Sequence, residues 1–584
     1  MVPADGSTLI SYANVDVVSS LESSFSTSEI GATTSGISSD SGTTNGSTMN
    51  GSTTNGSTSD SSKTEPAQSE AARSDSGKAD SGQSDSGKPE AAVTGASASG
   101  TSAGSGPPPT VIVPAQQAAA SSQQSDLKSG QQALSNLAPE RANSALVAPS
   151  VPQMQQSLSN ATNQVRNGGL GPQSGLPRPG TGADSWLLAT AEPLPGSSDA
   201  GRAALLPLVF NRAAYTPAVL HVRFSEARGG TVRSDTDAFL DLTLVPMQGE
   251  VEGRRVEVSK QDFAALLKQL YTQLSRQESL NNSNPSAPAR RLYELLIGPI
   301  APVLAKRGIT TLLISADRGL QAVPFAALHD GQRYFGDTYA FSLTPSLALT
   351  SMALPQAGQG RLLAAGAAVF DGLAPLPLVP SELDQVGRIE AKDVALNRSF
   401  TPSTLLEQAA DPRYSRVHVA THAEFLPGGP AASRLYSGTV PIPLSDFVKL
   451  RRARQGPPLD LISFSACRTA LGDADSELGF AGLALQVGAR SAVGTLWYVD
   501  DVATSAYFVQ MYRYLEAGIP KAEALQLTRQ AFSRGLVRLD GDQLLGPEGR
   551  ALLSGLTSGQ QRRVAGGLQN PYFWAGVELL GAAW

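Results

Sequence analysis

The chain has 584 residues, a net charge of −6 at neutral pH and a single cysteine. The tightest basic cluster, at 451–454, is typical of a solvated helix end, so we expect no nucleic-acid partner. No run of about 18 apolar residues is present, which excludes a predicted membrane-spanning helix. One cysteine also excludes a disulfide within the chain and leaves the compartment open.

The N-terminal third of the chain has the composition of a linker. Residues 26–183 contain no aromatic side chain and consist mainly of Ser, Gly, Thr, Ala, Asn and Gln. Such a segment buries too little apolar surface to offset the entropy of ordering, so we predict a disordered tether. Scattered leucines in 126–166 leave a transient or partner-induced helix open, but no aromatic or long apolar anchor favours a stable one.

The first 25 residues predict one or two isolated strands, like the end of a domain cut off upstream. No basic and apolar signal peptide is visible at the start. The chain is therefore interpreted either as a soluble cytoplasmic protein or as a piece of a larger protein that is secreted or displayed at the cell surface.

Residues 184–284 predict a β-rich lead-in followed by a helix. Apolar runs at 186–189, 218–224 and 239–245 are separated by turn-rich segments and read as antiparallel strands. Residues 261–276 carry apolar side chains at helical spacing, and 289–306 predict a second helix.

From residue 309 onward, strands and helices alternate, which predicts an α/β fold with a parallel sheet between helices. The strands are apolar throughout, as expected when both faces are covered. A short hairpin is predicted at 433–443. The predicted strands are 311–315, 361–365, 394–396, 416–421, 459–464 and 491–496, and the predicted helices are 380–389, 401–410, 479–487, 500–517 and 520–535.

Two reactive side chains follow neighbouring predicted strands. Cys467 comes just after the strand at 459–464, and His422 comes at the end of the strand at 416–421. Reactive groups of an open α/β sheet are presented at the carboxyl ends of its strands. The pattern therefore predicts a Cys–His nucleophilic pair.

These residues allow two other interpretations. A lone cysteine is often a small buried apolar residue with no chemical role. Cys467 with His418 and His422 would make three metal ligands, but a spacing of four suits a helix face and no further Cys or His cluster exists. We therefore expect neither a metal nor another cofactor, and we interpret His418 as a buried, hydrogen-bonded structural histidine.

Five separated motifs resemble those of the CHAT domain, a caspase-like domain, over residues 285–584. The family is related to caspases, separases and other cysteine peptidases. The motifs are Pro324-Phe325-Ala326-Ala327-Leu328, Val419-Ala420-Thr421-His422, 465–472 around Cys467, 488–501 around Trp497, and 570–576 around Trp574.

The resemblance implies a catalytic dyad of His422 and Cys467 in a cysteine endopeptidase. The thiolate would attack a peptide carbonyl while the imidazole acts as base and then as acid. It also implies an oxyanion hole formed by the backbone N–H groups of Cys467 and Ala423. Glycine is common after the histidine in this family, so a required positive φ at Ala423 would weaken that hole.

The resemblance further implies a pocket that reads a basic side chain of the substrate through an acidic residue. Asp501 ranks first by its place in the motif, followed by Asp500 and by Asp475 in the loop after the cysteine. Asp500 also fits a helix N-cap. The expected partners are a protein substrate and an activator or regulatory protein. The alternative function is a catalytically weak, caspase-like binding scaffold on a flexible tether.

Overall fold

The computed structural model describes residues 108–137, 146–167, 208–226, 237–317, 319–354, 360–388, 391–424, 426, 432–467, 469–470 and 479–584. The chain divides into two compact units, and every described residue belongs to the unit that contains Pro107–Trp584. Among the described helices, none combines the length and the hydropathy that crossing a membrane requires.

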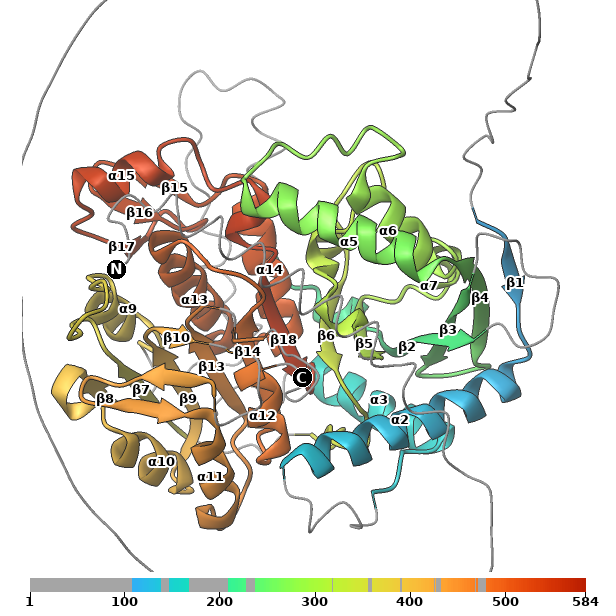
Figure 1. Ribbon diagram of the computed structural model, residues 1–584, viewed down its shortest axis with the longest axis horizontal. Helices are drawn as coiled ribbons and strands as arrows, with labels where there is room; N and C mark the ends of the chain where they lie inside the picture. The colour runs from blue at the N-terminus through green and yellow to red at the C-terminus, as the bar shows by residue number, and fades with distance from the viewer. Residues whose placement is uncertain are drawn as a thin grey trace, which may run out of the picture. The chain divides into compact units, whose positions relative to one another are not determined.

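A twelve-stranded sheet runs through this unit (Figure 1). Its strands, in order across the sheet, are β1 (Thr110–Ile112), β4 (Glu252–Val258), β3 (Ala238–Pro246), β2 (Pro217–Glu226), β5 (Thr311–Ala316), β6 (Ala340–Thr344), β18 (Val577–Gly581), β14 (Ser491–Thr495), β13 (Leu461–Ser465), β9 (Tyr414–Ala420), β7 (Arg361–Gly366) and β8 (Lys392–Leu396).

The sheet contains two parallel blocks that run in opposite directions. In the first block, β2, β5, β6 and β18 are parallel to one another. In the second block, β14, β13, β9, β7 and β8 are parallel, and β14 pairs with β18 in the antiparallel sense. The carboxyl ends of the two blocks therefore lie at opposite edges of the sheet. The predicted α/β fold with a mostly parallel, helix-flanked sheet is confirmed.

The lead-in is continuous with the sheet. β2 pairs in parallel with β5 along its length, and β3, β4 and β1 extend the same sheet in the antiparallel sense. Segment 208–284 thus completes one end of the sheet. The strands β6 and β18 are absent from the prediction, and β18 carries the buried Glu578 within an otherwise apolar run.

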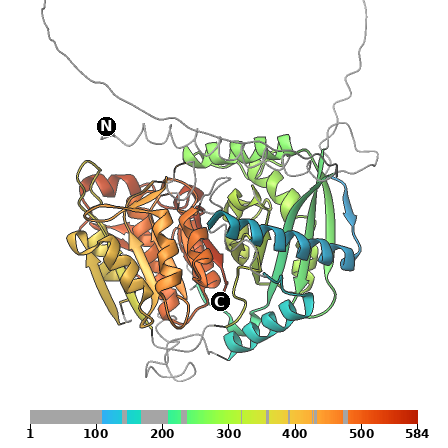
Figure 2. The same cartoon turned by 60° about the horizontal axis from the view of Figure 1, so that its bottom comes forward.

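Helices cover both faces of each block (Figures 1 and 2). On the first block, α5 (Lys260–Ser275), α6 (Pro288–Leu296) and α7 (Ala301–Lys306) lie on one face and α2 (Ala115–Leu137) and α3 (Val151–Arg166) on the other. On the second, α9 (Val379–Gln385) and α13 (Asp501–Glu516) lie on one face and α10 (Pro402–Ala410), α11 (Phe447–Ala453) and α12 (Gly479–Gln486) on the other. The remaining α-helices are α8 (Phe335–Thr338), α14 (Lys521–Ser533) and α15 (Ser558–Val564). Two small sheets hold the remaining strands: one contains β10 (Ala423–Glu424), β11 (Arg434–Tyr436) and β12 (Pro441–Pro443), and the other contains β15 (Arg538–Asp540), β16 (Gln543–Leu545) and β17 (Ala551–Leu553).

The linker prediction over 26–183 is wrong for β1, α2 and α3. α3 begins with a capping box between Ser150 and Gln153, and its Met154, Leu158 and Val165 are buried. These apolar side chains, at helical spacing, supply the apolar face for which we expected aromatic or long apolar anchors to be needed. The predicted strands at 1–25 and 186–189, and most of the rest of the linker, lie outside the described residues.

Candidate active site

Strand register brings the predicted dyad to one edge of the sheet. β9 and β13 are parallel neighbours, with Ala420 opposite Ser465 at their last paired position. His422 and Cys467 each follow two residues later on adjacent strands, which lie about 4.8 Å apart in a sheet. Thr421 N–H also donates to the Ser465 carbonyl, at 3.3 Å, beyond the last pair. The two side chains are therefore held at equivalent strand exits.

His422 is held through one ring nitrogen. Its Nε2 lies 2.8 Å from the carbonyl oxygen of Ala374, and its ring centroid lies 4.8 Å from that of Phe370. Because a carbonyl only accepts, Nε2 carries the proton and Nδ1 keeps the lone pair that a base needs. Burial lowers the pKa of His422 below its usual 6.5, and the hydrogen bond to Ala374 partly opposes this. The imidazole is thus neutral at neutral pH.

The loop that holds His422 is fixed by Asn397. Residues 367–378 follow β7, and the Asn397 side-chain oxygen accepts from the backbone N–H of Ala368 at 2.8 Å and of Val369 at 3.3 Å. Asn397 has φ +54, a left-handed conformation that asparagine tolerates better than most residues. A strained residue therefore positions the loop whose carbonyl fixes the imidazole tautomer.

The turn that presents Cys467 is fixed by two threonines. The Ala466 carbonyl accepts from Thr495 Oγ1 at 2.8 Å and from Thr469 Oγ1 at 3.2 Å. Thr495 N–H donates in turn to Thr469 Oγ1 at 3.0 Å. Cys467 itself is half-buried. The thiol thus lies on a turn that threonine hydrogen bonds hold in place, and it has partial access to solvent.

Alanine fits the position after the histidine. Among described residues other than glycine, only Gln277 and Asn397 have positive φ, so Ala423 is not strained. Ala423 pairs with Leu435 in the antiparallel β10–β11 ladder, and Tyr436 N–H donates to the His422 carbonyl at 3.0 Å. Alternation along such a ladder turns the Ala423 N–H away from β11. The position after the histidine therefore holds alanine without backbone strain.

His418 is a buried structural residue. It is fully buried, and its Nε2 lies 3.0 Å from Oε1 of Glu382, whose Oε2 accepts from Ser505 Oγ at 2.6 Å. Glu382 is on α9 and Ser505 is on α13, so this chain of hydrogen bonds ties both helices to β9. The interpretation of His418 as a hydrogen-bonded core histidine is confirmed.

The acidic residues after Trp497 have different roles. Asp500 is the N-cap of α13: its side chain accepts from Ala503 N–H at 3.0 Å and lies 3.7 Å from Arg563. Burial raises the pKa of Asp501 to about 7, helped by the nearby charges of Glu382 and Asp500. Asp501 is thus a desolvated carboxyl surrounded mainly by other acids. Asp475 lies outside the described residues.

Tyr572 lies within electrostatic reach of both Cys467 and Asp500 at the start of α13. Burial raises its pKa, and negative charge on Asp500 and on Cys467 raises it further. Its hydroxyl donates to the Tyr498 carbonyl at 3.1 Å, and its own carbonyl accepts from Trp497 Nε1 at 3.0 Å.

Sequence reasoning missed Phe370, Ala374, Asn397 and Tyr572 as neighbours of the dyad. Tyr572 was inside a quoted motif but had no assigned place. The other three residues follow β7 and β8, and only the lateral pairing of β7 with β9 brings their loops to His422. The local signal was the Phe-Asp-Gly turn at 370–372 directly after an apolar strand.

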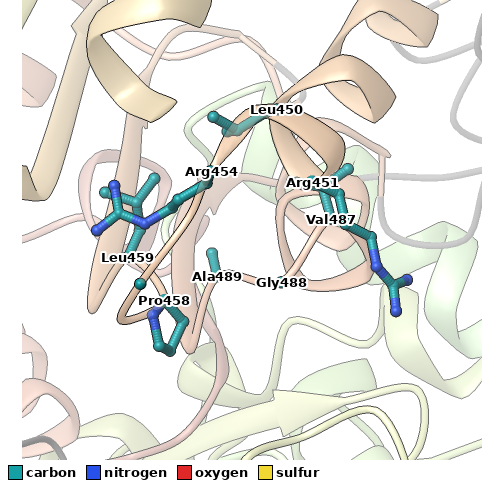
Figure 3. Close-up of a pocket in the computed structure, with 9 residues that line it drawn as sticks. Leu450, Arg451, Arg454, Pro458, Leu459, Val487, Gly488 and Ala489 are labelled. Carbon is teal, nitrogen blue, oxygen red and sulfur yellow. The ribbon is translucent and has the colours of Figure 1, made fainter. Parts of the chain in front are cut away.

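A pocket of about 200 Å³ lies away from this edge (Figure 3). It is lined by Leu450, Leu459 and Ala489, and the last two precede β13 and β14. It therefore sits at the amino ends of these strands, whereas Cys467 follows the carboxyl end. Arg454, on its wall, donates to the carbonyls of Pro457 and Tyr414, which is a structural role. Among the described residues, no cluster of three or more His, Cys, Asp or Glu side chains is arranged to hold a metal.

Solved structures with similarity to the chain include cysteine peptidases. Two Saccharomyces cerevisiae separase–securin complexes match at 9% and 10% identity, covering 65% and 80% of this chain and 31% and 37% of theirs, with TM-scores of 0.36 and 0.38. The chain therefore spans only about a third of the length of those chains. The Arg-specific cysteine proteinase gingipain R matches at 10% identity over 50% of this chain and 68% of its own, with a TM-score of 0.31.

A search of curated proteins finds no match. The CHAT domain family model, in contrast, matches residues 286–582, which is more than half of the chain and includes every residue of the site described above. The predicted start of the domain at 285 agrees with this boundary. The chain belongs to the CHAT domain family.

Proposed function

We propose that the chain is a cysteine endopeptidase in which His422 and Cys467 form the catalytic dyad. The observation that carries this proposal is the hydrogen bond from His422 Nε2 to the Ala374 carbonyl, at the strand exit beside that of Cys467. His422 Nδ1 then keeps its lone pair at the strand exit next to a half-buried thiol, as a general base requires. Membership of the CHAT domain family supports the same reaction class.

In the proposed first half-reaction, His422 Nδ1 takes the proton of the Cys467 thiol as sulfur attacks the peptide carbonyl carbon. The C–S bond forms, and the carbonyl oxygen becomes an oxyanion that accepts from the N–H groups of Cys467 and Ala423. Each such donor contributes roughly 3 kcal/mol to lowering the barrier. The imidazolium then gives its proton to the leaving amine as the C–N bond breaks.

The second half-reaction returns the enzyme to its starting state. Water attacks the thioester while His422 Nδ1 accepts one of its protons, and the C–S bond breaks to release a carboxylic acid and the thiol. The Nε2–H bond to Ala374 is kept throughout, so the ring does not flip between the two steps. A single fixed tautomer therefore serves both halves.

For substrate selection, we propose that Asp501 receives a basic side chain next to the scissile bond. Its pKa of about 7 means that ionisation costs free energy in the folded protein, because burial desolvates the carboxyl and its neighbours Glu382 and Asp500 are acidic. A substrate arginine or lysine would supply the missing positive charge. Asp500 is the weaker choice, since its oxygens already cap α13 and face Arg563.

The single thiol provides a direct test. The rate of Cys467 alkylation by iodoacetamide is measured against pH by intact mass, for the wild type and for His422→Ala, with matched thermal unfolding curves. We expect fast labelling at neutral pH in the wild type, and slower labelling with an upward-shifted midpoint in the variant. Slow labelling that the variant leaves unchanged would contradict the dyad and favour the scaffold alternative.

A further inference from the structure

The C-terminal end of α5 contacts the segment that follows β14. Tyr271 is 4% exposed, and its ring meets the indole of Trp497 edge to face, with ring centroids 5.8 Å apart and planes at 89°. Its hydroxyl donates to the Ala322 carbonyl at 2.6 Å, which fixes the direction of the ring. Tyr271 precedes residue 286, where the match to the family model begins. A residue outside the matched domain therefore packs against one of the motifs of that domain.

Trp497 lies close to the turn that carries Cys467. Two residues before Trp497, the Thr495 carbonyl accepts from the N–H of Ala470 at 2.9 Å, three positions after the cysteine. Gly576 makes room for the indole, since a Cβ there would lie 2.5 Å from Cε2 of Trp497. Close contacts therefore determine where the indole lies beside the cysteine turn.

A second contact with the end of α5 runs through Asn570. Trp497 Nε1 donates to the Tyr572 carbonyl at 3.0 Å, and Tyr572 N–H donates to Asn570 Oδ1 at 2.9 Å. Asn570 Nδ2 donates in turn to the carbonyls of Gln277 and Glu278, just after α5, at 2.9 and 3.2 Å. The lead-in therefore holds Tyr572 by two routes, one through Trp497 and one through Asn570.

Tyr572 lies near both the thiol and the acidic residues at the start of α13. Its phenol is within electrostatic reach of Cys467 and of Asp500. Its hydroxyl donates at 3.1 Å to the carbonyl of Tyr498, two residues before Asp500. A basic side chain that extends from a scissile bond at Cys467 toward Asp501 would therefore run beside this ring.

We propose that Tyr271 is a positioning residue for the substrate pocket, acting through Trp497 and Tyr572. It holds in place the wall along which a basic side chain of the substrate reaches Asp501. The inference rests on the proposed peptidase function and extends it, because the pocket then depends on a segment outside the matched family domain. Binding of the basic side chain should depend on Tyr271, whereas the reactivity of the thiol toward a small reagent should not.

Phe263 provides a matched control, because it makes the same kind of contact about two turns earlier in α5. It is 1% exposed and meets Phe224 of β2 edge to face, with ring centroids 5.5 Å apart and planes at 89°. Tyr271→Leu and Phe263→Leu thus remove comparable rings from one helix and should cost similar stability, but only the first ring contacts Trp497. Tyr271→Phe keeps the ring and loses only the hydroxyl.

Hydrogen exchange of the full chain, measured by peptide mass, tests the positioning without any catalysis. Tyr271→Leu should speed exchange at least about tenfold in peptides that cover 496–500 and 570–576, and Phe263→Leu should leave these peptides as in the wild type. Unchanged protection in Tyr271→Leu, or equal loss in both variants, would overturn the proposal. Failure of the peptidase proposal shows instead in the alkylation of the wild-type chain, so the two failures are distinguishable.

Steady-state kinetics test the effect on the substrate. For peptides with arginine before the scissile bond, Tyr271→Leu should raise KM about tenfold and leave kcat within about twofold, because it weakens binding in the ground and transition states alike. The rate and pH midpoint of Cys467 alkylation by iodoacetamide should stay as in the wild type, and Tyr271→Phe and Phe263→Leu should keep the wild-type KM. A wild-type KM in Tyr271→Leu, or an equal rise in Phe263→Leu, would overturn the proposal.

Discussion

The carboxyl ends of the two parallel blocks lie at two edges of one sheet, and the polar groups at these edges are hydrogen-bonded in different ways. At the ends of β9 and β13, a half-buried imidazole is held through Nε2, which leaves Nδ1 with its lone pair, and a half-buried thiol follows the neighbouring strand. At the ends of β5 and β6, Asp126 satisfies two backbone N–H groups and two hydroxyls at once. One edge therefore keeps the lone pair of His422 Nδ1 for chemistry. At the other edge, the carboxylate oxygens of Asp126 already accept hydrogen bonds.

Removing the proposed general base, His422, should have the largest effect on the difference between the two edges, because it abolishes the chemistry of one of them. His422→Ala should lower kcat/KM by about 10³-fold, because general base catalysis contributes roughly 10²–10⁴-fold. Peptide turnover measured from pH 4.5 to 8 should rise in the wild type with a midpoint below 6.5, since the pKa of His422 is lowered and only its neutral form is a base. A midpoint above 6.5, or activity retained in the variant, would show that peptide hydrolysis does not depend on His422 as the general base.

Loosening the loop that orients the base should have the next largest effect. Asn397→Ala removes the acceptor for Ala368 and Val369 and places alanine at φ +54, so the Ala374 carbonyl loses its fixed position. We expect kcat to fall between about 10- and 100-fold with little change in KM. Asn397→Asp keeps the acceptor and should retain most of the activity, with a near-normal pH profile of Cys467 alkylation; equal losses in both variants would contradict a positioning role.

Replacing Asp501 with a neutral residue should raise the stability of the protein but weaken its preference for basic side chains in the substrate. Because the pKa of Asp501 is raised to about 7, folding favours its protonated form, and the stability that this contributes is full below about pH 4 and is lost as the pH rises through 7. Asp501→Asn should therefore raise the free energy of unfolding by about 2 kcal/mol at pH 8 and leave it unchanged at pH 4. It should also reduce cleavage after arginine and lysine.

Asp500 provides the matched control for that change. Asp500→Ala removes the N-cap of α13 and should destabilise the protein by about 1 kcal/mol. Urea unfolding at pH 4 and pH 8 distinguishes the two residues, because only Asp501→Asn should stabilise and only at the higher pH. Destabilisation by Asp501→Asn at pH 8 would show that its carboxylate is paired.

The smallest effect is expected from the turn that carries the thiol. Thr495→Val removes one of two hydrogen bonds to the Ala466 carbonyl, and Thr469 keeps the other. The expected cost is about 1 kcal/mol in thermal unfolding and a few-fold loss in alkylation rate. Thr495→Ser keeps the hydroxyl and should restore the alkylation rate. A loss of all reactivity in Thr495→Val would mean that the threonine hydrogen bonds to the Ala466 carbonyl control the reactivity of Cys467 more than His422 does.

The sequence predicted the strands that carry the dyad because apolar runs ending in a polar turn are local patterns. Cys467 and His422 could be placed at strand exits for that reason, and the register of β9 with β13 agrees with it. The contact between His422 and Ala374 could not be predicted, because it depends on which strands pair laterally. Ser465 and Ala420 are 45 positions apart, and no local pattern encodes their alignment.

The helices of the N-terminal segment were missed for a different reason. α2 is rich in Ala, Ser and Gln, and its composition resembles that of a linker. The contacts that hold α2 include four hydrogen-bond donors to the Asp126 carboxylate, which belong to residues about 190 to 220 positions away. Composition measures how much apolar surface a segment can bury, but it does not reveal a buried carboxylate whose partners are distant in sequence.

The central position of β18 has a consequence for how the protein is made. β18 lies between β6 and β14, so the inner edges of both blocks stay unpaired until residues 577–581 leave the ribosome. More than two hundred residues separate β6 from β18, which corresponds to roughly 10 to 50 s of translation at 5–20 residues per second. During this time the nascent chain exposes the edge of β6, the kind of surface from which aggregation begins. The order of the strands therefore sets how long that edge waits for its neighbour during synthesis.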